Sequence, residues 1–166
     1  MIQPAKISEI SDILIMTNAC RLFMESNNIF QWTIEYPSEN HFINDIERNE
    51  LYTLKNNDLI IGCIVISTFM DAEYKTVQWL TPNENNIYIH RLAVHPSFQG
   101  LGCAQQLMAF GEEYAVNNRF TSIRLDTFSQ NKRNQKFYEM RGYQKLDDIY
   151  FPEQSQHPFH CYELVL

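Results

Sequence analysis

The stretch from Ile87 to Met108 reads IYIHRLAVHPSFQGLGCAQQLM and decides the fold of the chain around it. An apolar run typical of a β-strand ends near Val94, a turn carries Gly100 and Gly102, and a helical pattern follows. Helix N-termini bind anions because their N–H groups are unpaired, and glycine allows a close approach. The stretch therefore predicts a strand, an anion-binding turn and a helix in succession.

The composition is that of an ordinary soluble globular protein. The 166 residues are 45% hydrophobic and 20% charged, which predicts a single domain over residues 1–166 with a sizeable core. A formal net charge of −7 disfavours general binding to nucleic acid or to an anionic membrane. The charge is compatible with a cationic substrate, although acidic residues also serve solubility alone.

The sequence indicates neither export nor a membrane span nor a metal site. The N-terminus lacks an apolar core of signal-peptide length, and the longest apolar run, Leu59–Ile66, is too short to cross a bilayer. Four scattered cysteines have neither disulfide nor zinc-ligand spacing: Cys20, Cys63, Cys103 and Cys161. We therefore expect a cytoplasmic protein with reduced thiols and no bound metal.

Apolar periodicity along the chain predicts a mixed α/β sheet. We expect helices at about 8–26, 38–48, 100–117 and 131–141, and strands at about 2–5, 51–55, 59–69, 87–94, 121–127, 143–150 and 159–166. The second and third strands should form a hairpin, and the polar segment 70–86 a long excursion. The aromatic connection at Phe30, Trp32 and Tyr36 either packs on the sheet or walls a substrate cleft.

Two familiar phosphate-binding designs fit the glycine turn poorly. A P-loop would need Gly-Lys-Ser or Gly-Lys-Thr, and this turn has no lysine. A dinucleotide fingerprint would need glycine or alanine where Gln105 stands and would begin directly after the strand, whereas His95–Gln99 intervenes. Asp126 lies about twenty residues further on, where that fingerprint has an acid, so a nucleotide-dependent oxidoreductase stays an alternative.

A third design is supported by two separate motifs. The first is Arg/Gln-x-x-Gly-x-Gly/Ala, met by Gln99, Gly102 and Ala104. The second is an Asn two helical turns before a Tyr, with a Gly-aromatic pair after it, met by Asn131, Tyr138 and Gly142-Tyr143. With them the chain resembles the GNAT superfamily of acetyl-CoA-dependent N-acetyltransferases, closely from Ile87 to Tyr143. The resemblance implies a mostly antiparallel α/β sheet with a splayed central strand, flanked by helices.

The resemblance implies acetyl-CoA as co-substrate. Its pyrophosphate would lie on the amides of the turn, which are those of Gln99, Gly100, Leu101, Gly102, Cys103, Ala104 and Gln105. The backbone of Leu92, Ala93 and Val94 would pair with pantetheine as another strand does, and one amide there would polarise the thioester carbonyl. Asn131 would contact CoA, cap its helix, or do both.

The resemblance also implies the catalytic groups. Tyr138 would be the general acid that protonates the departing CoA thiolate. Histone-type members use a strand glutamate as base, but Tyr88 stands at that position here. Members that acetylate protein N-termini have a Glu on the next strand, five residues before the helix Asn, and Asp126 stands at that position. Asp126 is therefore the first candidate for the base, unless it pairs with Arg124 or caps a turn. His90 is the second candidate, and strand alternation places it on one face with Leu92 in the absence of a bulge.

Two functions of different classes remain open at this point. The first is an N-acetyltransferase whose acceptor is a primary amine of a small molecule, an amino acid or a peptide N-terminus. Such an enzyme works by direct attack through a tetrahedral intermediate. The second is a catalytically silent module that binds or senses acyl-CoA, which the missing strand glutamate would explain. Exposed strand edges make a homodimer possible, and the sequence identifies neither the acceptor nor the oligomeric state.

Overall fold

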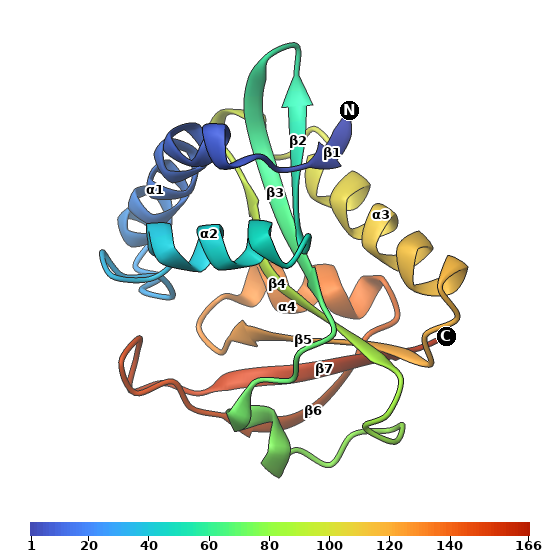
Figure 1. Cartoon of the computed structure of the whole chain (residues 1–166). Coiled ribbons are helices and arrows are strands. Elements are labelled where there is room, and N and C mark those ends of the chain that lie inside the picture. Colours follow the sequence, from blue (N-terminus) through green and yellow to red (C-terminus); the bar gives the residue numbers. More distant parts are fainter.

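One open sheet of seven strands organises the molecule, and the computed structural model describes all residues from 1 to 166 (Figure 1). The strands are β1 (Ile2–Pro4), β2 (Leu51–Asn56), β3 (Leu59–Ser67), β4 (Asn86–Val94), β5 (Ser122–Phe128), β6 (Gln144–Ile149) and β7 (Phe159–Val165). Their order is β1-β2-β3-β4-β5-β7-β6, and β4 and β5 are the one parallel pair. This mostly antiparallel arrangement confirms the predicted fold class.

Four α-helices cover the two faces of the sheet. They are α1 (Ile10–Ser26), α2 (Glu39–Glu47), α3 (Cys103–Asn117) and α4 (Lys132–Met140). Figure 1 shows α1 and α2 on one side of β3 and α3 on the other. None of these helices combines the length and the apolar character that a membrane crossing requires. Every predicted helix and strand is present, with ends that differ by a few residues.

Strand β3 is buried on both faces, which places the core on either side of it. Ile64 and Ile66 point into the cluster that contains Leu107 of α3. Cys63 and Val65, which alternate with them, point into the cluster under α1 and α2. The alternation has the period of two expected of a strand, and a sheet between two helical layers is the result.

Strand β4 carries a bulge, and beyond it β4 separates from β5. Val65 pairs with His90 and Cys63 with Ala93, so β4 holds one more residue than β3 between these pairs. Arg91 lies in the extra position with a φ of 48°. The parallel ladder with β5 covers only Asn86 to Tyr88 of β4. The predicted splayed strand is thereby confirmed, and a bulge of this kind accounts for it.

The bulge corrects one prediction about side-chain direction. Leu92 and Val94 pack into the same cluster as Ile87 and Ile89, on the α3 side of the sheet. Regular alternation would have placed Leu92 with His90 instead. The expectation that these two residues share a face held only for a strand without a bulge, and it does not apply here because the additional residue reverses the side-chain direction after it.

The excursion between β3 and β4 is tied to the sheet. It contains a 3-10 helix at Ala72–Thr76. Arg124 of β5 is fully buried, forms an ion pair with Glu163 of β7 (Nε to Oε1, 3.0 Å) and donates from Nη2 to the carbonyl of Thr81 at 2.6 Å. Glu163 also accepts from the amide of Leu80 at 2.5 Å. Arg124 is thus engaged by Glu163 and not by Asp126, the alternative that the sequence left open.

Candidate functional site

A groove of about 770 Å³ runs between the end of β4, the N-termini of α3 and α4, and the C-terminal part of α1. Of the eleven residues predicted to bind the cofactor, nine line it: Leu92, Ala93, Val94, Gln99, Gly100, Cys103, Ala104, Gln105 and Asn131. Leu101 and Gly102 lie in the same turn but do not line the groove. The fold therefore brings most of this predicted set together.

The turn before α3 presents a row of unpaired amides. The backbone N–H groups from Gly100 to Gln105 donate to no oxygen of the chain, and the first amide with a partner is that of Gln106, bonded to the carbonyl of Gly102 at 3.0 Å. Gly100 and Gly102 have φ values of 79° and 83°, in the left-handed region that favours glycine. Six free amides at a helix N-terminus are suited to binding a pyrophosphate.

The last residues of β4 offer a free strand edge to the groove. On one side Ala93 and Val94 pair with Cys63 and Gly62 of β3. On the other side no strand pairs with them, because β5 has diverged. The carbonyl of Val94 already accepts from the side-chain amide of Gln99 at 3.1 Å. An extended ligand with peptide-like amides can pair with such an edge.

Asn131 links the start of α4 to the segment after α1. Its Oδ1 accepts from the amide of Asn134 at 3.1 Å, which caps the helix. Its Nδ2 donates to Oε1 of Gln31 at 3.1 Å. The side chain is buried and lines the groove, so capping the helix and facing a cofactor are compatible.

A second cavity of about 310 Å³ adjoins the groove. Four residues line both: Gln31, Trp32, Leu92 and Asn134. The smaller cavity brings together the three side chains predicted as catalytic, which are Tyr138, Asp126 and His90. Two of the three residues of the aromatic connection serve the predicted purposes, since Trp32 packs in the core under α1 while Trp32 and Tyr36 line the cavity. Phe30 is 56% exposed and lines neither cavity.

Asp126 accepts a hydrogen bond from the excursion between β3 and β4, and its pKa is high for a carboxyl group. The hydroxyl of Tyr74, in the 3-10 helix, donates to Oδ2 of Asp126 at 2.5 Å. Burial raises the pKa of Asp126 to about 7; the nearby charges of Asp71 and Glu73 add to this, and the Tyr74 hydrogen bond opposes it. A carboxylate with this pKa exchanges protons near neutral pH.

His90 and Tyr138 titrate far from neutral pH. Burial lowers the pKa of His90 to about 3, and the charge of Arg91 contributes, so the imidazole is neutral. Burial also raises the pKa of Tyr138, with a contribution from the charge of Asp126, so its hydroxyl keeps its proton. Tyr138 is only 5% exposed, and its hydroxyl forms no hydrogen bond within the chain.

Comparison with known proteins identifies the family. The sequence profile of the acetyltransferase (GNAT) family matches residues 16–143, which is well over half of the chain. The chain belongs to this family. The match confirms the resemblance and sets aside the dinucleotide-binding alternative.

One curated relative matches part of the chain, and solved structures share its fold over nearly the whole length. The uncharacterized N-acetyltransferase YesJ of Bacillus subtilis (strain 168) is 25% identical over 99 residues, which are 60% of this chain and 55% of that protein. A crystal structure from Staphylococcus aureus Mu50, proposed to be an acetyltransferase, is 27% identical with a TM-score of 0.77, covering 99% of this chain and 98% of the other. The PaiA N-acetyltransferase of Thermoplasma acidophilum, solved in complex with coenzyme A, has 16% identity and a TM-score of 0.73 over 100% of this chain and 98% of that one.

Several charged residues that line the two cavities were not predicted from the sequence. Three cations of α4 line the larger groove, namely Lys132, Arg133 and Lys136. Their position just after the motif asparagine was a signal that could have found them. Arg91 lines the smaller cavity and forms a bidentate ion pair with the buried Asp45 of α2 (2.8 and 2.7 Å). No local pattern predicts that pair, because 46 residues separate its members.

Proposed function

We propose that the chain is an acetyl-CoA-dependent N-acetyltransferase that acts on a primary amine by direct attack. One observation carries the proposal: the groove with the unpaired amides opens onto a cavity that contains Asp126 and Tyr138. The donor would lie in the groove and the acceptor in the smaller cavity. The whole chain would form one such catalytic domain, while cytoplasmic location and a homodimer stay predictions.

The donor half rests on backbone groups. The amides from Gly100 to Gln105 would bind the pyrophosphate of acetyl-CoA, and the free edge of Leu92, Ala93 and Val94 would pair with pantetheine. An amide of that edge would donate to the thioester oxygen and stabilise the oxyanion of the tetrahedral intermediate. Asn131 would close the groove from α4. The complex of PaiA with coenzyme A supports this assignment through the shared fold.

Asp126 is the base that the environment favours. An alkylammonium must lose a proton before its nitrogen can attack the thioester carbon. The carboxylate of Asp126 would take that proton, directly or through water, and its pKa of about 7 suits the transfer at neutral pH. His90 is a poor second, because an imidazole whose pKa is lowered to about 3 holds a proton weakly.

Tyr138 would complete the reaction as the general acid. When the tetrahedral intermediate collapses, the C–S bond breaks and the electron pair goes to sulfur. Tyr138 lines the cavity, and its hydroxyl, which keeps its proton, would donate that proton to the thiolate. The products are the N-acetylated amine and CoA. The nitrogen is positively charged after the attack, and its second proton would pass through water to the Tyr138 phenolate, while Asp126 would release the first proton to solvent.

A silent acyl-CoA-binding module is the second candidate, favoured only by Tyr88 at the position of the histone-type glutamate. Tyr88 is buried, and its hydroxyl accepts from Arg124 at 3.2 Å, so it has a structural role. Release of CoA from acetyl-CoA with a panel of amines distinguishes the two. Tight CoA binding by calorimetry without turnover of any amine would favour the silent module, and no CoA binding would refute both.

Tyr138→Phe tests the assignment of the acid. We expect kcat to fall about 10²- to 10⁴-fold while the Kd of CoA changes little, because only proton transfer is removed. Tyr150→Phe is the matched control, since Tyr150 is 56% exposed and lines neither cavity. Equal kcat values for the two variants would contradict the role of Tyr138.

A further inference from the structure

The smaller cavity carries carboxylates that lie outside ion-pair distance of every lysine and arginine, although the charges of Arg91 and Arg48 act on Asp71 and that of Arg91 on Asp126. Asp71, Glu73 and Glu153 line it together with Asp126, and none of the four forms an ion pair with a lysine or arginine. The imidazole Nδ1 of His90 lies 3.9 Å from Oδ2 of Asp71. That imidazole is neutral, because its pKa is lowered by burial. A cationic ligand is therefore the complement of this cavity.

The one permanent cation among the lining residues is already engaged. Nε and Nη2 of Arg91 donate to the two carboxylate oxygens of Asp45 at 2.8 and 2.7 Å, and Nη1 donates to the hydroxyl of Tyr36 at 3.1 Å. His41, the remaining basic residue, has a pKa lowered by burial and by the charge of Arg91. A carboxylate on the acceptor would find no free cation here.

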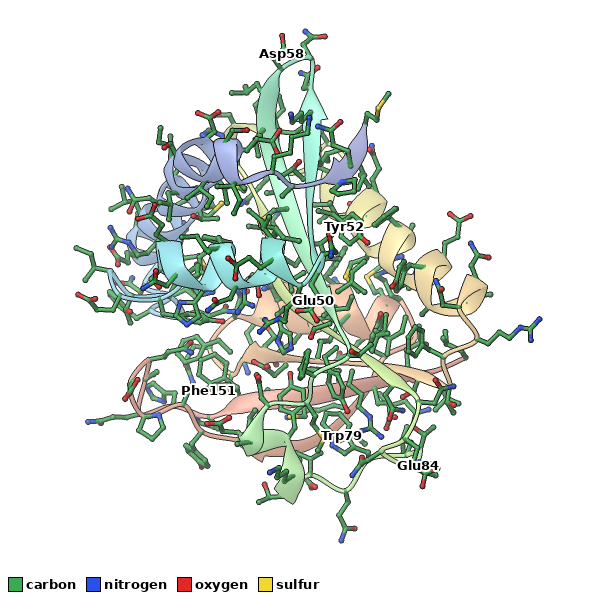
Figure 2. All side chains as sticks on the ribbon, viewed as in Figure 1. Glu50, Tyr52, Asp58, Trp79, Glu84 and Phe151 are labelled. Atoms are coloured by element: carbon green, nitrogen blue, oxygen red, sulfur yellow. The ribbon has the colours of Figure 1, made fainter.

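The same cavity has an apolar wall. Trp32, Phe151 and Phe159 line it beside the acids. Phe151 belongs to the connection between β6 and β7, on the side of the molecule opposite Glu84 in the view of Figure 2. Aromatic faces next to carboxylates suit a short methylene chain that ends in an ammonium group.

We infer that the acceptor is a diamine or polyamine: a primary amine with a second cationic nitrogen a few methylenes away and no carboxylate. This inference rests on the proposed function. The reacting nitrogen would lie at Asp126 and Tyr138; the Tyr138 side chain is 5% exposed, lines the cavity and forms no hydrogen bond within the chain. That nitrogen must be neutral when it attacks, so a monoamine would leave Asp71, Glu73 and Glu153 uncompensated in the reactive complex. A second ammonium keeps its protons and pairs with them.

Three acceptors with the same four methylenes isolate the charge at the far end. They are 1,4-diaminobutane, pentylamine and 5-aminopentanoate, which end in an ammonium, a methyl and a carboxylate. For wild-type protein we expect kcat/KM for the diamine to exceed that for pentylamine about 10- to 100-fold, as for a charged hydrogen bond. Of the three acceptors, 5-aminopentanoate should have the lowest kcat/KM.

A double variant and a control locate the preference in the cavity. In the double variant Glu73→Gln/Glu153→Gln, kcat/KM for the diamine divided by kcat/KM for pentylamine should fall about tenfold. The reason is that both side chains keep their size but lose the charge that would pair with the second ammonium. Glu84→Gln, an exposed acid at the far end of the same excursion, should keep the wild-type ratio. Pentylamine or 5-aminopentanoate as the best substrate would overturn the inference, as would a ratio that survives in the double variant.

If the proposed transferase activity is wrong, the experiment gives a result that differs from failure of the dication site. If wild-type protein acetylates none of the three, calorimetry with 1,4-diaminobutane added to the CoA-saturated protein decides. Binding that the double variant weakens would keep the dication site while the proposed activity falls. No binding would overturn the site as well.

Discussion

Tyr74→Phe gives a direct test of how the excursion controls the proposed base. The hydroxyl of Tyr74 donates to Oδ2 of Asp126 at 2.5 Å and is the one side-chain hydrogen bond that lowers the pKa of this carboxyl. The phenylalanine ring would keep the packing against Trp79, Tyr88 and His90, whose ring centroids lie 5.2, 5.7 and 6.2 Å from that of Tyr74. The substitution therefore removes the hydrogen bond and little else.

The direction of the expected pKa shift follows from the fact that the Tyr74 hydroxyl stabilises the ionised form of Asp126. Asp126 accepts a proton only when ionised, so kcat/KM should rise with pH through its pKa of about 7. Loss of a donor to the ionised form raises this pKa further. A hydrogen bond to a charged group contributes about 1.5–3 kcal/mol, and 1.36 kcal/mol is one pKa unit. We expect the acidic limb of the profile to move upward by about one to two pH units.

The assay is the rate of CoA release, followed with a thiol reagent over about pH 5.5 to 10, with kcat/KM taken at each pH because it reports the free enzyme. The acceptor amine titrates in the same way in the assay of every variant, so a difference in the pH dependence of kcat/KM between variants arises from the protein. Tyr150→Phe serves as the control and should leave the limb at its wild-type position.

An acidic limb that stays in place in Tyr74→Phe, or moves to lower pH, would refute the reasoning. Asp126→Asn supplies the second check. If Asp126 is the base, this variant loses most of its activity and the limb near neutral pH disappears. A limb that persists in Asp126→Asn would assign the titration to another group.

Three further substitutions test the frame of the site. Gly62→Ala should lower Tm and weaken CoA binding in calorimetry, because a Cβ there would meet the carbonyl oxygen of Ala93 at 2.8 Å and push β4 away. Asp45→Asn should lower the free energy of unfolding in urea by about 3–5 kcal/mol, because it leaves Arg91 buried without its counter-charge. Arg133→Ala should raise KM for acetyl-CoA about twofold to fivefold, an effect that added salt reduces. An unchanged Tm in Gly62→Ala, an unchanged free energy of unfolding in Asp45→Asn, or an unchanged KM in Arg133→Ala would contradict the corresponding prediction.

The proposed donor half of the site could be predicted from sequence because its signals are local. Gln99, the two glycines of the turn and Asn131 lie at fixed spacings within a strand, a turn and two helices. Backbone amides do the proposed binding, so the side chains only had to permit the geometry. The elements themselves were predicted well for the same reason, since apolar periodicity is a property of each segment alone.

The acceptor half depends on contacts between segments far apart in the sequence. Tyr74 and Asp126 are 52 residues apart, and Tyr74 lies in a polar excursion without periodicity. The burial that raises the pKa of Asp126 comes from the packing of that excursion on the sheet, which Arg124 and Glu163 secure. Asp126 could be proposed as a base from its position, but its environment could not.

The bulge at Arg91 joins the two halves. A non-glycine residue in the left-handed region costs about 1–2 kcal/mol, so something must hold it there. The bidentate pair with Asp45 and the hydrogen bond to Tyr36 do so, and they tie α2 and the aromatic connection to β4. The additional residue turns Leu92 toward α3, leaves His90 in the smaller cavity and frees the strand edge that we propose for the donor. The same ion pair that holds the bulge also occupies the one permanent cation of the acceptor cavity, so the geometry proposed for the donor and the charge proposed for the acceptor have one structural cause.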